Sequence, residues 1–366
     1  MLRRPELRAP LLDRVAEVDR VVLLGDVLEL RHGPVRDVIA ASRPFFDDLA
    51  RALAGRELVI IPGNHDHALV EPWLARRCAT DEPPPLGVEQ LLDPAEASPT
   101  LERIARWAAP AAVRVAYPGM WLRPDVYATH GHYLDSHMTV PTLERLSLGA
   151  MARVVGRPAS EFACVDDYEA VGAPVFAWRD ALVRDAPAGS LLNGATTVGA
   201  WRALTGAGAS SGGSHGEPLR RLRRGATAAA FSLAIAALNR AGLGPLRADV
   251  STSELRRAGL RAMGEVAARL RLGDAHVVFG HTHRAGPFPG DEQQEWVGRA
   301  GSRLVNVGSW TYAPIFLTAT SGESPYWPGV CALLEDHGPP RLERLLQERT
   351  HAELRPLPRA PAAVAG

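Results

Sequence analysis

Lysine is absent from this chain, so all 41 of its Lys-plus-Arg side chains are arginines. Acidic residues also number 41, which makes the formal net charge zero. A neutral chain has no overall electrostatic attraction to nucleic acid or to anionic lipid. The composition therefore gives no specific signal for a nucleic-acid partner.

Cysteine is scarce, and long apolar runs are missing. Cys78, Cys164 and Cys331 lie far apart and form no C-x-x-C pair, which favours a reducing compartment and hence a cytoplasmic protein. Residues 2–14 mix arginine with proline and lack the apolar core of a signal peptide. The longest weakly polar run, residues 226–238, is shorter than the roughly 20 residues that a membrane-spanning helix needs.

Short apolar runs are present, and four of them are each followed by residues that can bind a metal. The runs 21–24, 58–61, 126–129 and 275–280 are typical of strands buried on both faces. The residues that follow them are Asp26, Asn64, His65, His130, His281 and His283. Loops at the carboxyl ends of such strands open into a shared crevice. Carboxylate, amide oxygen and imidazole suit Mn, Fe or Zn, and two such ions can assist phosphoester hydrolysis.

The four blocks also resemble the motifs of a known family. They read Gly25-Asp26-Val27-Leu28-Glu29, Gly63-Asn64-His65-Asp66, His130-Gly131-His132 and Gly280-His281-Thr282-His283. In this order they are similar to four of the five motifs of the calcineurin-like metallophosphoesterases, which run D-x-H, G-D-x-x-[ED], G-N-H-[DE], H or H-G-H, and G-H-T-H. The resemblance implies an α/β fold in which a two-sheet β-sandwich is flanked by helices. It also implies a hydrolase of phosphomonoesters or phosphodiesters.

The resemblance assigns metal ligands for a binuclear centre of two divalent ions. Asp26 would bridge the two ions, and His283 would belong to the first. Asn64, His130 and His281 would hold the second.

The resemblance also implies catalytic roles. His65 matches the family's catalytic histidine, with Asp66 beside it as a candidate orienting carboxylate. The nucleophile would be a metal-bridging hydroxide, so no covalent phosphoenzyme is required.

The D-x-H motif, which supplies two ligands of the first metal in the family, is missing from the start of the chain. Residues 1–10 are polar and interrupted by proline, and cannot be the strand that precedes it. Three explanations are open. The start of the protein lies upstream, or Asp135-Ser136-His137 replaces the lost pair, or the chain is a one-metal or inactive relative. The last explanation keeps a second function open, a non-catalytic protein that binds a ligand or partner.

Several further residues are candidates for substrate contact. For each of His132, Asp135 and His137, substrate contact and a structural role in the loop are about equally favoured. Arg31 could bind a phosphate with two hydrogen bonds, although a solvated loop is the favoured interpretation. Asn306 belongs to an N-x-G-S segment that resembles the one closing the family's site, and otherwise forms a turn.

Residues 1–137 and 273–350 are predicted to form the metallophosphoesterase core. Residues 138–272, rich in alanine, leucine and arginine at helical spacing, are predicted to be a mainly helical cap above the crevice, with a glycine-rich linker at 205–218. Within the cap, residues 220–238 could contact a membrane surface, although a buried helix is favoured. Residues 351–366 are predicted to be a disordered tail.

Local patterns predict the remaining elements. Residues 11–18, 43–53 and 101–109 read as helices, and a short helix is expected around Leu91. Residues 113–116 and 120–123 read as a hairpin.

Overall fold

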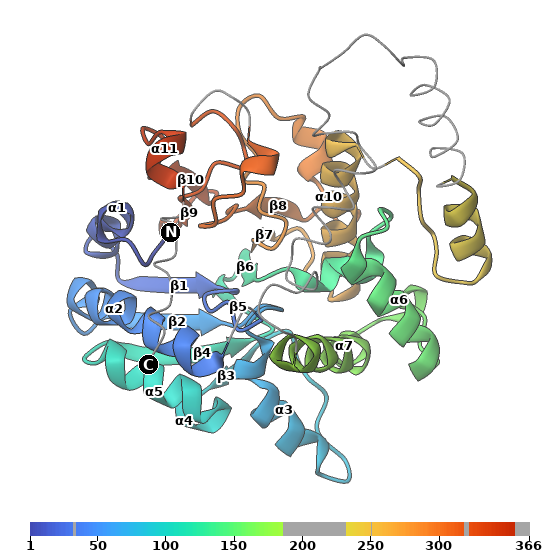
Figure 1. Ribbon diagram of the computed structural model, residues 1–366, viewed down its shortest axis with the longest axis horizontal. Helices are drawn as coiled ribbons and strands as arrows, with labels where there is room; N and C mark the ends of the chain where they lie inside the picture. The colour runs from blue at the N-terminus through green and yellow to red at the C-terminus, as the bar shows by residue number, and fades with distance from the viewer. Residues whose placement is uncertain (32–33, 186–231, 250, 318–321, 356–366) are drawn as a thin grey trace, which may run out of the picture.

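The computed structural model describes residues 1–31, 34–185, 232–249, 251–317 and 322–355. They form a mixed α/β fold with two four-stranded sheets and one two-stranded sheet (Figure 1). In the first sheet the order is β1-β2-β4-β3, and β1, β2 and β4 run parallel. Its strands are β1 (Arg20–Leu24), β2 (Glu57–Ile61), β4 (Ala112–Tyr117) and β3 (Gln90–Leu92).

The second sheet has the order β5-β6-β7-β8, with β6, β7 and β8 parallel. Its strands are β5 (Gly119–Arg123), β6 (Val126–Thr129), β7 (His276–Phe279) and β8 (Arg303–Asn306). The small antiparallel sheet pairs β9 (Val330–Leu333) with β10 (Arg341–Arg344). The four strands predicted before the metal-type residues are thus confirmed as β1, β2, β6 and β7.

Apolar side chains of both four-stranded sheets share one buried cluster. Val59 and Ile61 of β2 meet Val126 and Ala128 of β6 and Val278 of β7 in it. Strands buried in this way lose water from both faces, which explains their continuous apolar sequences. The carboxyl ends of β1 and β2 therefore lie near those of β6 and β7.

Helices cover the outer side of the first sheet, where α2 and α5 pack together (Figure 1). Phe46, Leu49 and Leu53 of α2 are buried there, and burying each contributes about 1.5–3 kcal/mol. The helices before β5 are α1 (Pro5–Val15), α2 (Val35–Leu53), η1 (His67–Leu69), α3 (Glu71–Cys78), α4 (Pro94–Ala97) and α5 (Pro99–Ala108). The three helices predicted in this region exist, but α1 and α2 begin earlier than expected because proline is tolerated inside both.

Three local predictions are wrong. Residues 113–116 and 120–123 form no hairpin, because β4 pairs with β2 and β3 while β5 pairs with β6 in the other sheet. The segment around Leu91 is strand β3, since the free edge of β4 provides a partner that the local sequence does not reveal. The predicted tail starts with helix α11 (His351–Leu354), which Thr350 and Glu353 stabilise as a capping box, while residues 356–366 lie outside the described part of the chain. Leu354 anchors this helix in an apolar cluster with Leu7, so ordered structure extends past residue 350.

Within the described residues of the segment predicted to be a cap, helices are joined by turns and irregular loops, and there is no strand. Its helices are α6 (Leu143–Val155), η3 (Ala159–Glu161), α7 (Val165–Asp185), a helix at 232–240 and α10 (Thr252–Arg269). The helices α6 and α7 pack on each other, whereas α10 packs on η2 (His132–His137) and β8. The linker at 205–218 and most of the segment 220–238 lie outside the described residues.

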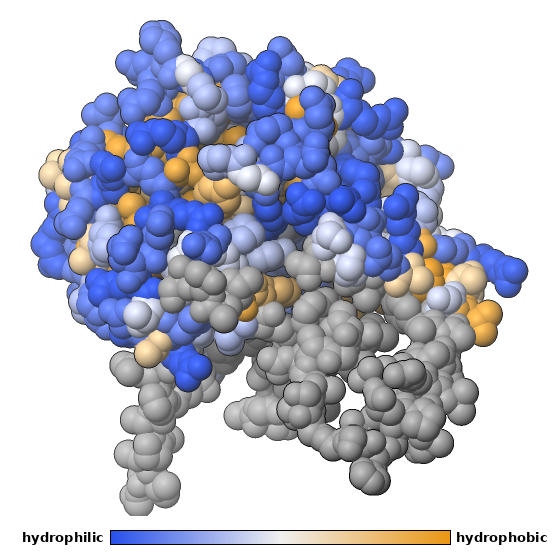
Figure 2. All heavy atoms as spheres, turned by 90° about the horizontal axis from the view of Figure 1, so that it is seen from above, coloured by the Kyte–Doolittle hydropathy of each residue, from blue (hydrophilic) through white to orange (hydrophobic). Residues whose placement is uncertain are grey.

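The remaining short helices are η4 (Gln293–Trp296) and η5 (Pro314–Phe316). Hydrophilic residues dominate the face of the molecule in Figure 2. Among the described helices, none is both long and apolar enough to span a membrane.

A buried carboxylate fixes α7 to the strand layers. The hydroxyls of Tyr117 and Tyr133 both donate to Glu169 Oε1, and His67 Nε2 lies 3.2 Å from Glu169 Oε2. Burial works to raise the pKa of Glu169, but the contacts with His67 and the two tyrosines outweigh it and the pKa is lowered. His67 is thus a structural histidine that helps to hold α7.

We expect Glu169→Ala to lower the free energy of unfolding by about 3 kcal/mol or more, because it leaves several buried polar groups without their acceptor. Chemical denaturation followed by circular dichroism measures the loss. The matched control is Glu335→Ala at an exposed position, which should change stability by less than about 0.5 kcal/mol. Equal stability of the two variants would contradict the role of Glu169.

Candidate metal centre

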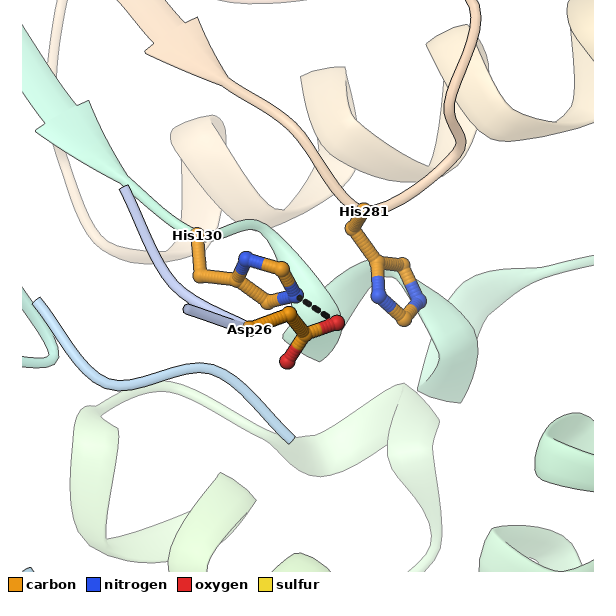
Figure 3. A group of neighbouring side chains, drawn as sticks. All are labelled: Asp26, His130 and His281. Atoms are coloured by element: carbon orange, nitrogen blue, oxygen red, sulfur yellow. Dashed lines mark ion pairs between the residues drawn. The ribbon is translucent and has the colours of Figure 1, made fainter. Parts of the chain in front are cut away.

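The loops that follow β1, β6 and β7 bring three metal-type side chains together (Figure 3). Asp26, His130 and His281 each offer a ligand atom, and these atoms lie within 4.8 Å of one another. No other such group of histidine, cysteine and acidic residues occurs in the part of the chain that the structure describes. The structure thus gathers at one point residues that lie as far apart as 26 and 281 in the sequence.

His130 has one ring nitrogen committed to the backbone and the other directed at two oxygens. Its Nδ1 lies 3.0 Å from the carbonyl oxygen of Leu24, which requires Nδ1 to carry a proton. Its Nε2 lies 3.2 Å from Asp26 Oδ2 and 3.2 Å from Asn64 Oδ1. In neutral His130 the lone pair of Nε2 therefore faces two oxygen atoms that are also acceptors. Only a cation or a further proton can satisfy Nε2 and these two oxygens together.

His281 is oriented by a carboxylate. Its Nε2 lies 2.9 Å from Asp135 Oδ2, so Nδ1 remains the free ligand atom. The side-chain amide of Asn306 holds the loop that carries His281. It donates to the Gly280 carbonyl and to Thr282 Oγ1, both at 2.9 Å. Asn306 Oδ1 also accepts from the backbone of Gly308. The amide of Asn306 therefore positions the loop that carries His281.

The charges at the site favour a bound cation. Burial works to raise the pKa of Asp26, but the positive charge of His130 and its contact with the carboxylate outweigh it, and the pKa falls well below its usual value. Burial works to lower the pKa of His130, and the charge of Asp26 raises it instead. The carboxylate of Asp26 therefore favours a positive charge at His130, as it would favour a cation bound at the same place.

The backbone at the site is strained. Asp26, His281 and His283 have φ of 52°, 61° and 61°, and they are three of the five non-glycine residues with positive φ among those described. This conformation costs about 1–3 kcal/mol per residue and clusters at functional sites. Packing is equally tight, because a Cβ at Gly25 would overlap the ring of His130 and one at Gly63 would overlap the carboxylate of Asp26.

Asp66 holds the loops of the site in place. Its carboxylate accepts from the backbone N–H groups of Asp26, Val27 and Leu28 at 3.2, 2.8 and 3.2 Å, and from that of Gly63 at 2.6 Å. Burial and the charge of Asp26 raise the pKa of Asp66 to about 6. The structure places Asp66 on the backbone of the Asp26 loop, which differs from the predicted role of orienting His65.

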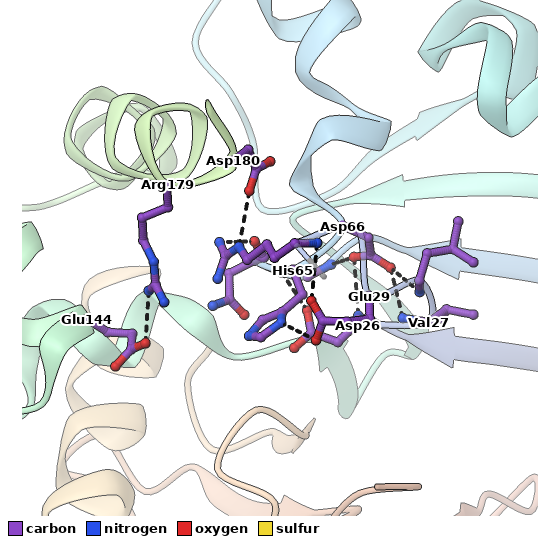
Figure 4. Close-up of polar contacts among 12 residues, drawn as sticks. Asp26, Val27, Glu29, His65, Asp66, Glu144, Arg179 and Asp180 are labelled. Carbon is purple, nitrogen blue, oxygen red and sulfur yellow. Dashed lines mark hydrogen bonds and ion pairs between the residues drawn. The ribbon is translucent and has the colours of Figure 1, made fainter. Parts of the chain in front are cut away.

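The carboxylate that contacts His65 is Glu29 (Figure 4). His65 Nδ1 lies 2.7 Å from Glu29 Oε2, and the backbone N–H of His65 donates to Asp26 Oδ1 at 2.8 Å. Burial works to lower the pKa of His65, but the hydrogen bond with Glu29 and the charge of Asp26 raise it overall. Glu29 is the last residue of the G-D-x-x-E motif, and its spacing from Asp26 was the signal that could have identified it.

Two further histidines lie near the cluster with neutral rings. Burial and the charge of His281 lower the pKa of His283 to about 4, so its imidazole is uncharged, as a ligand must be. His132 is 2 % exposed, and neither of its ring nitrogens has a hydrogen-bond partner within the described ranges. Burial and the charge of His130 lower the pKa of His132 well below its usual value.

Arg31 is buried, so the favoured interpretation of a solvated loop is wrong. It is 3 % exposed, Nη2 donates to the carbonyl oxygen of Asn64, and Nε donates to Asp180 Oδ1 of α7 at 3.2 Å. Its Nη1 is buried and finds no hydrogen-bond partner in the described residues. The guanidinium also packs 5.7 Å from the ring of Phe176, which belongs to α7. Helix α7 therefore reaches the site through Arg31.

His137 does not share the site with Asp135. Its Nε2 lies 2.8 Å from the hydroxyl of Tyr168, and its ring packs against Phe162. The structure thus brings only the aspartate of the Asp135-Ser136-His137 segment to the cluster. Sequence reasoning also missed an ion pair near the site. Glu144 of α6 and Arg179 of α7 form it at 2.9 Å (Figure 4).

Comparison with protein-family models, with curated proteins and with solved structures found no match.

We expect His130→Ala to lower the affinity for Mn²⁺ or Zn²⁺ by more than about 100-fold. Removing a residue that only hydrogen-bonds to a metal ligand lowers the affinity about 10–100-fold, and removing the ligand itself should lower it further. Competition with a chromophoric chelator measures this affinity. His337→Ala, at an exposed position, should bind metal as the unmodified protein does. Unchanged affinity in the His130 variant would contradict the proposed metal centre.

Proposed function

We propose that this protein is a metal-dependent phosphoesterase that hydrolyses a phosphomonoester or phosphodiester, and that it is a relative of the calcineurin-like metallophosphoesterases. The single observation that carries the proposal is the convergence of Asp26, Asn64 and His130 on one point, next to His281. The four motif blocks lie at the ends of strands from two facing sheets, and this supports a sandwich of the metallophosphoesterase type.

Asp26, Asn64, His130 and His281 would hold divalent metal, with Asp26 also facing a second ion that His283 would help to bind. A mixed set of carboxylate, amide and imidazole ligands suits Mn, Fe or Zn. When bound, such ions activate water as a nucleophile and neutralise charge on the phosphoryl oxygens. Asp135 and the Leu24 carbonyl keep the ligand nitrogens of the two histidines directed inward.

His65 is the residue that can supply a proton to the leaving oxygen. Its Nδ1 donates to Glu29, so its Nε2 is the nitrogen available to a substrate, and the side chain is 31 % exposed. Because Glu29 and Asp26 raise the pKa of His65, the ring keeps its proton to a higher pH than an ordinary histidine does. We assign His65 as the general acid and Glu29 as its positioning residue.

Arg31 is suited to bind the phosphoryl group. Its buried Nη1 has no hydrogen-bond partner within the described part of the chain, and its other two nitrogens are held by Asp180 and the Asn64 carbonyl. A guanidinium held in this way loses little entropy when it binds an anion. His132 lies next to His130 and could contribute a neutral imidazole to the same group.

The test of the proposal is hydrolysis of phosphate esters by purified protein with Mn²⁺. We expect turnover of at least one monoester or diester, and we expect His65→Ala to lower kcat by about 10²–10⁴-fold while metal content is kept. Activity that resists both chelation and His65→Ala would contradict the proposal. Protein that binds metal and nucleotides tightly but hydrolyses none of the esters would favour the alternative, a non-catalytic binding protein.

The pH dependence of the reaction tests the pairing of Glu29 with His65. Glu29 raises the pKa of His65, so Glu29→Gln should lower that pKa. A step that needs protonated His65 then fails at a lower pH, and the alkaline limb of the kcat profile should move toward acid. Glu17→Gln, at an exposed position just after α1, is the control. An unmoved alkaline limb would argue against His65 as the acid.

Substitution of Arg31 tests its contact with the phosphoryl group. We expect Arg31→Met to raise KM about tenfold or more, because a charge-assisted hydrogen bond to the substrate is lost. Arg36→Met removes an equivalent charge from an exposed position and should leave KM unchanged. Steady-state kinetics with a thermal unfolding curve separate this effect from a loss of stability. A KM equal to that of the unmodified protein would contradict the assignment.

A further inference from the structure

A cavity of about 130 Å³ adjoins the candidate metal centre. His281 and Asp135 form part of its wall, so it begins where the cluster of metal-type residues ends. The remaining wall comes from η2, α10 and the loops that follow β7 and β8. Its apolar part is made by Met138, Leu255, Leu260, Phe279, Trp296 and Tyr326.

The size of the cavity fits a single aromatic ring. An apolar cavity of about 150 Å³ is known to remain free of water and to bind benzene. The cavity here is only slightly smaller, and three of its wall residues, Phe279, Trp296 and Tyr326, are aromatic. Aromatic rings pack well against one another at edges and offset faces. A ring is therefore a better occupant than a cluster of waters.

The charged residues of the wall are already paired. Arg256 lies 2.6 Å from Glu295, and Arg284 forms an ion pair with Asp291 while stacking 5.3 Å from the ring of Trp296. Among the described residues of the wall, both arginines thus have acidic partners, and neither offers an unpaired charge to a second phosphate. This favours an uncharged occupant.

One polar group of the wall lacks a partner. Trp296 is 3 % exposed, and its indole N–H is buried without a hydrogen-bond acceptor among the described residues. This N–H has almost no accessible surface, so it is not open to a molecule in the cavity, and Trp296 contributes its apolar ring surface to the wall. The occupant best suited to the cavity is thus an uncharged aromatic ring.

We propose that this cavity binds the aromatic part of the substrate, which makes the substrate an aryl phosphoester. The inference rests on the proposed function and gives its substrate class. For a monoester, water forms a new P–O bond, and the bond from phosphorus to the aryl oxygen breaks. The aryl oxygen leaves with the electron pair and takes a proton, so the products are a phenol and inorganic phosphate.

Gly259 of α10 offers a way to fill the cavity. It lines the wall, and a Cβ at this position would meet only Thr282 Cγ2 at 3.5 Å, which is ordinary contact. Gly259→Leu therefore places a side chain in the cavity without straining the helix. Ser253→Leu adds the same side chain to the same helix at an exposed position outside the cavity, and is the matched control.

The experiment compares the binding of phenylphosphonate and methylphosphonate to Mn²⁺-loaded protein by isothermal titration calorimetry. Both carry the same anionic group, and only the first carries a ring. We expect the unmodified protein and Ser253→Leu to bind phenylphosphonate at least about tenfold more tightly, because the ring is removed from water. In Gly259→Leu this ratio should fall to about one. Gly259→Ala, which adds a single methyl group, should lower the ratio partly and serves if the leucine variant does not fold.

Two results overturn the inference in distinguishable ways. If methylphosphonate binds in a metal-dependent manner and phenylphosphonate binds no better, the cavity does not take the ring, although the phosphoesterase proposal survives. The same conclusion follows if the ratio persists in Gly259→Leu. If neither phosphonate binds to the metal-loaded protein, the proposed function fails and the substrate class fails with it.

Discussion

The site depends on the hydrogen bond that each of two histidines makes with one of its ring nitrogens. His130 gives Nδ1 to the Leu24 carbonyl, and His281 gives Nε2 to Asp135, so each ring has one nitrogen left and one direction in which to point it. Both rings lie near the carboxylate of Asp26, which is partly buried. Acceptors held this close without donors between them repel one another. The divalent cation that we propose would turn that repulsion into attraction.

The rest of the fold supports this arrangement. Parallel strands of two sheets end at the same place, and Asp66 ties the loop after β1 to the loop after β2 through four backbone N–H groups. Positive φ at Asp26 and His281 is a cost that the surrounding hydrogen bonds and packing offset. On the other side, Glu169 anchors α7 on buried tyrosines, and the same helix holds Arg31 through Asp180. Site and helical segment therefore form one connected structure.

The sequence predicted the four strands and the ligand types at their ends, because burial on both faces leaves a continuous apolar run and a loop follows each run. It did not predict which carboxylate meets His65. Asp66 follows His65 directly in the chain, whereas Glu29 lies in another motif, and loop geometry brings Glu29 to the ring. It also missed Glu169 and Asp180, because helix periodicity does not show which polar residue faces inward. The hairpin prediction was wrong for a related reason, since an apolar pattern defines a strand but not its partner.

The central claim is that Asp26, Asn64, His130 and His281 gather to bind divalent metal. Diffraction from crystals soaked in Mn²⁺, recorded at the manganese absorption edge, tests it most directly. The account predicts an anomalous peak about 2.0–2.3 Å from the Asp26 carboxylate and from His130 Nε2, the range usual for oxygen and nitrogen ligands. An ordered crystal with these side chains in place, no peak between them, and manganese bound elsewhere would contradict it.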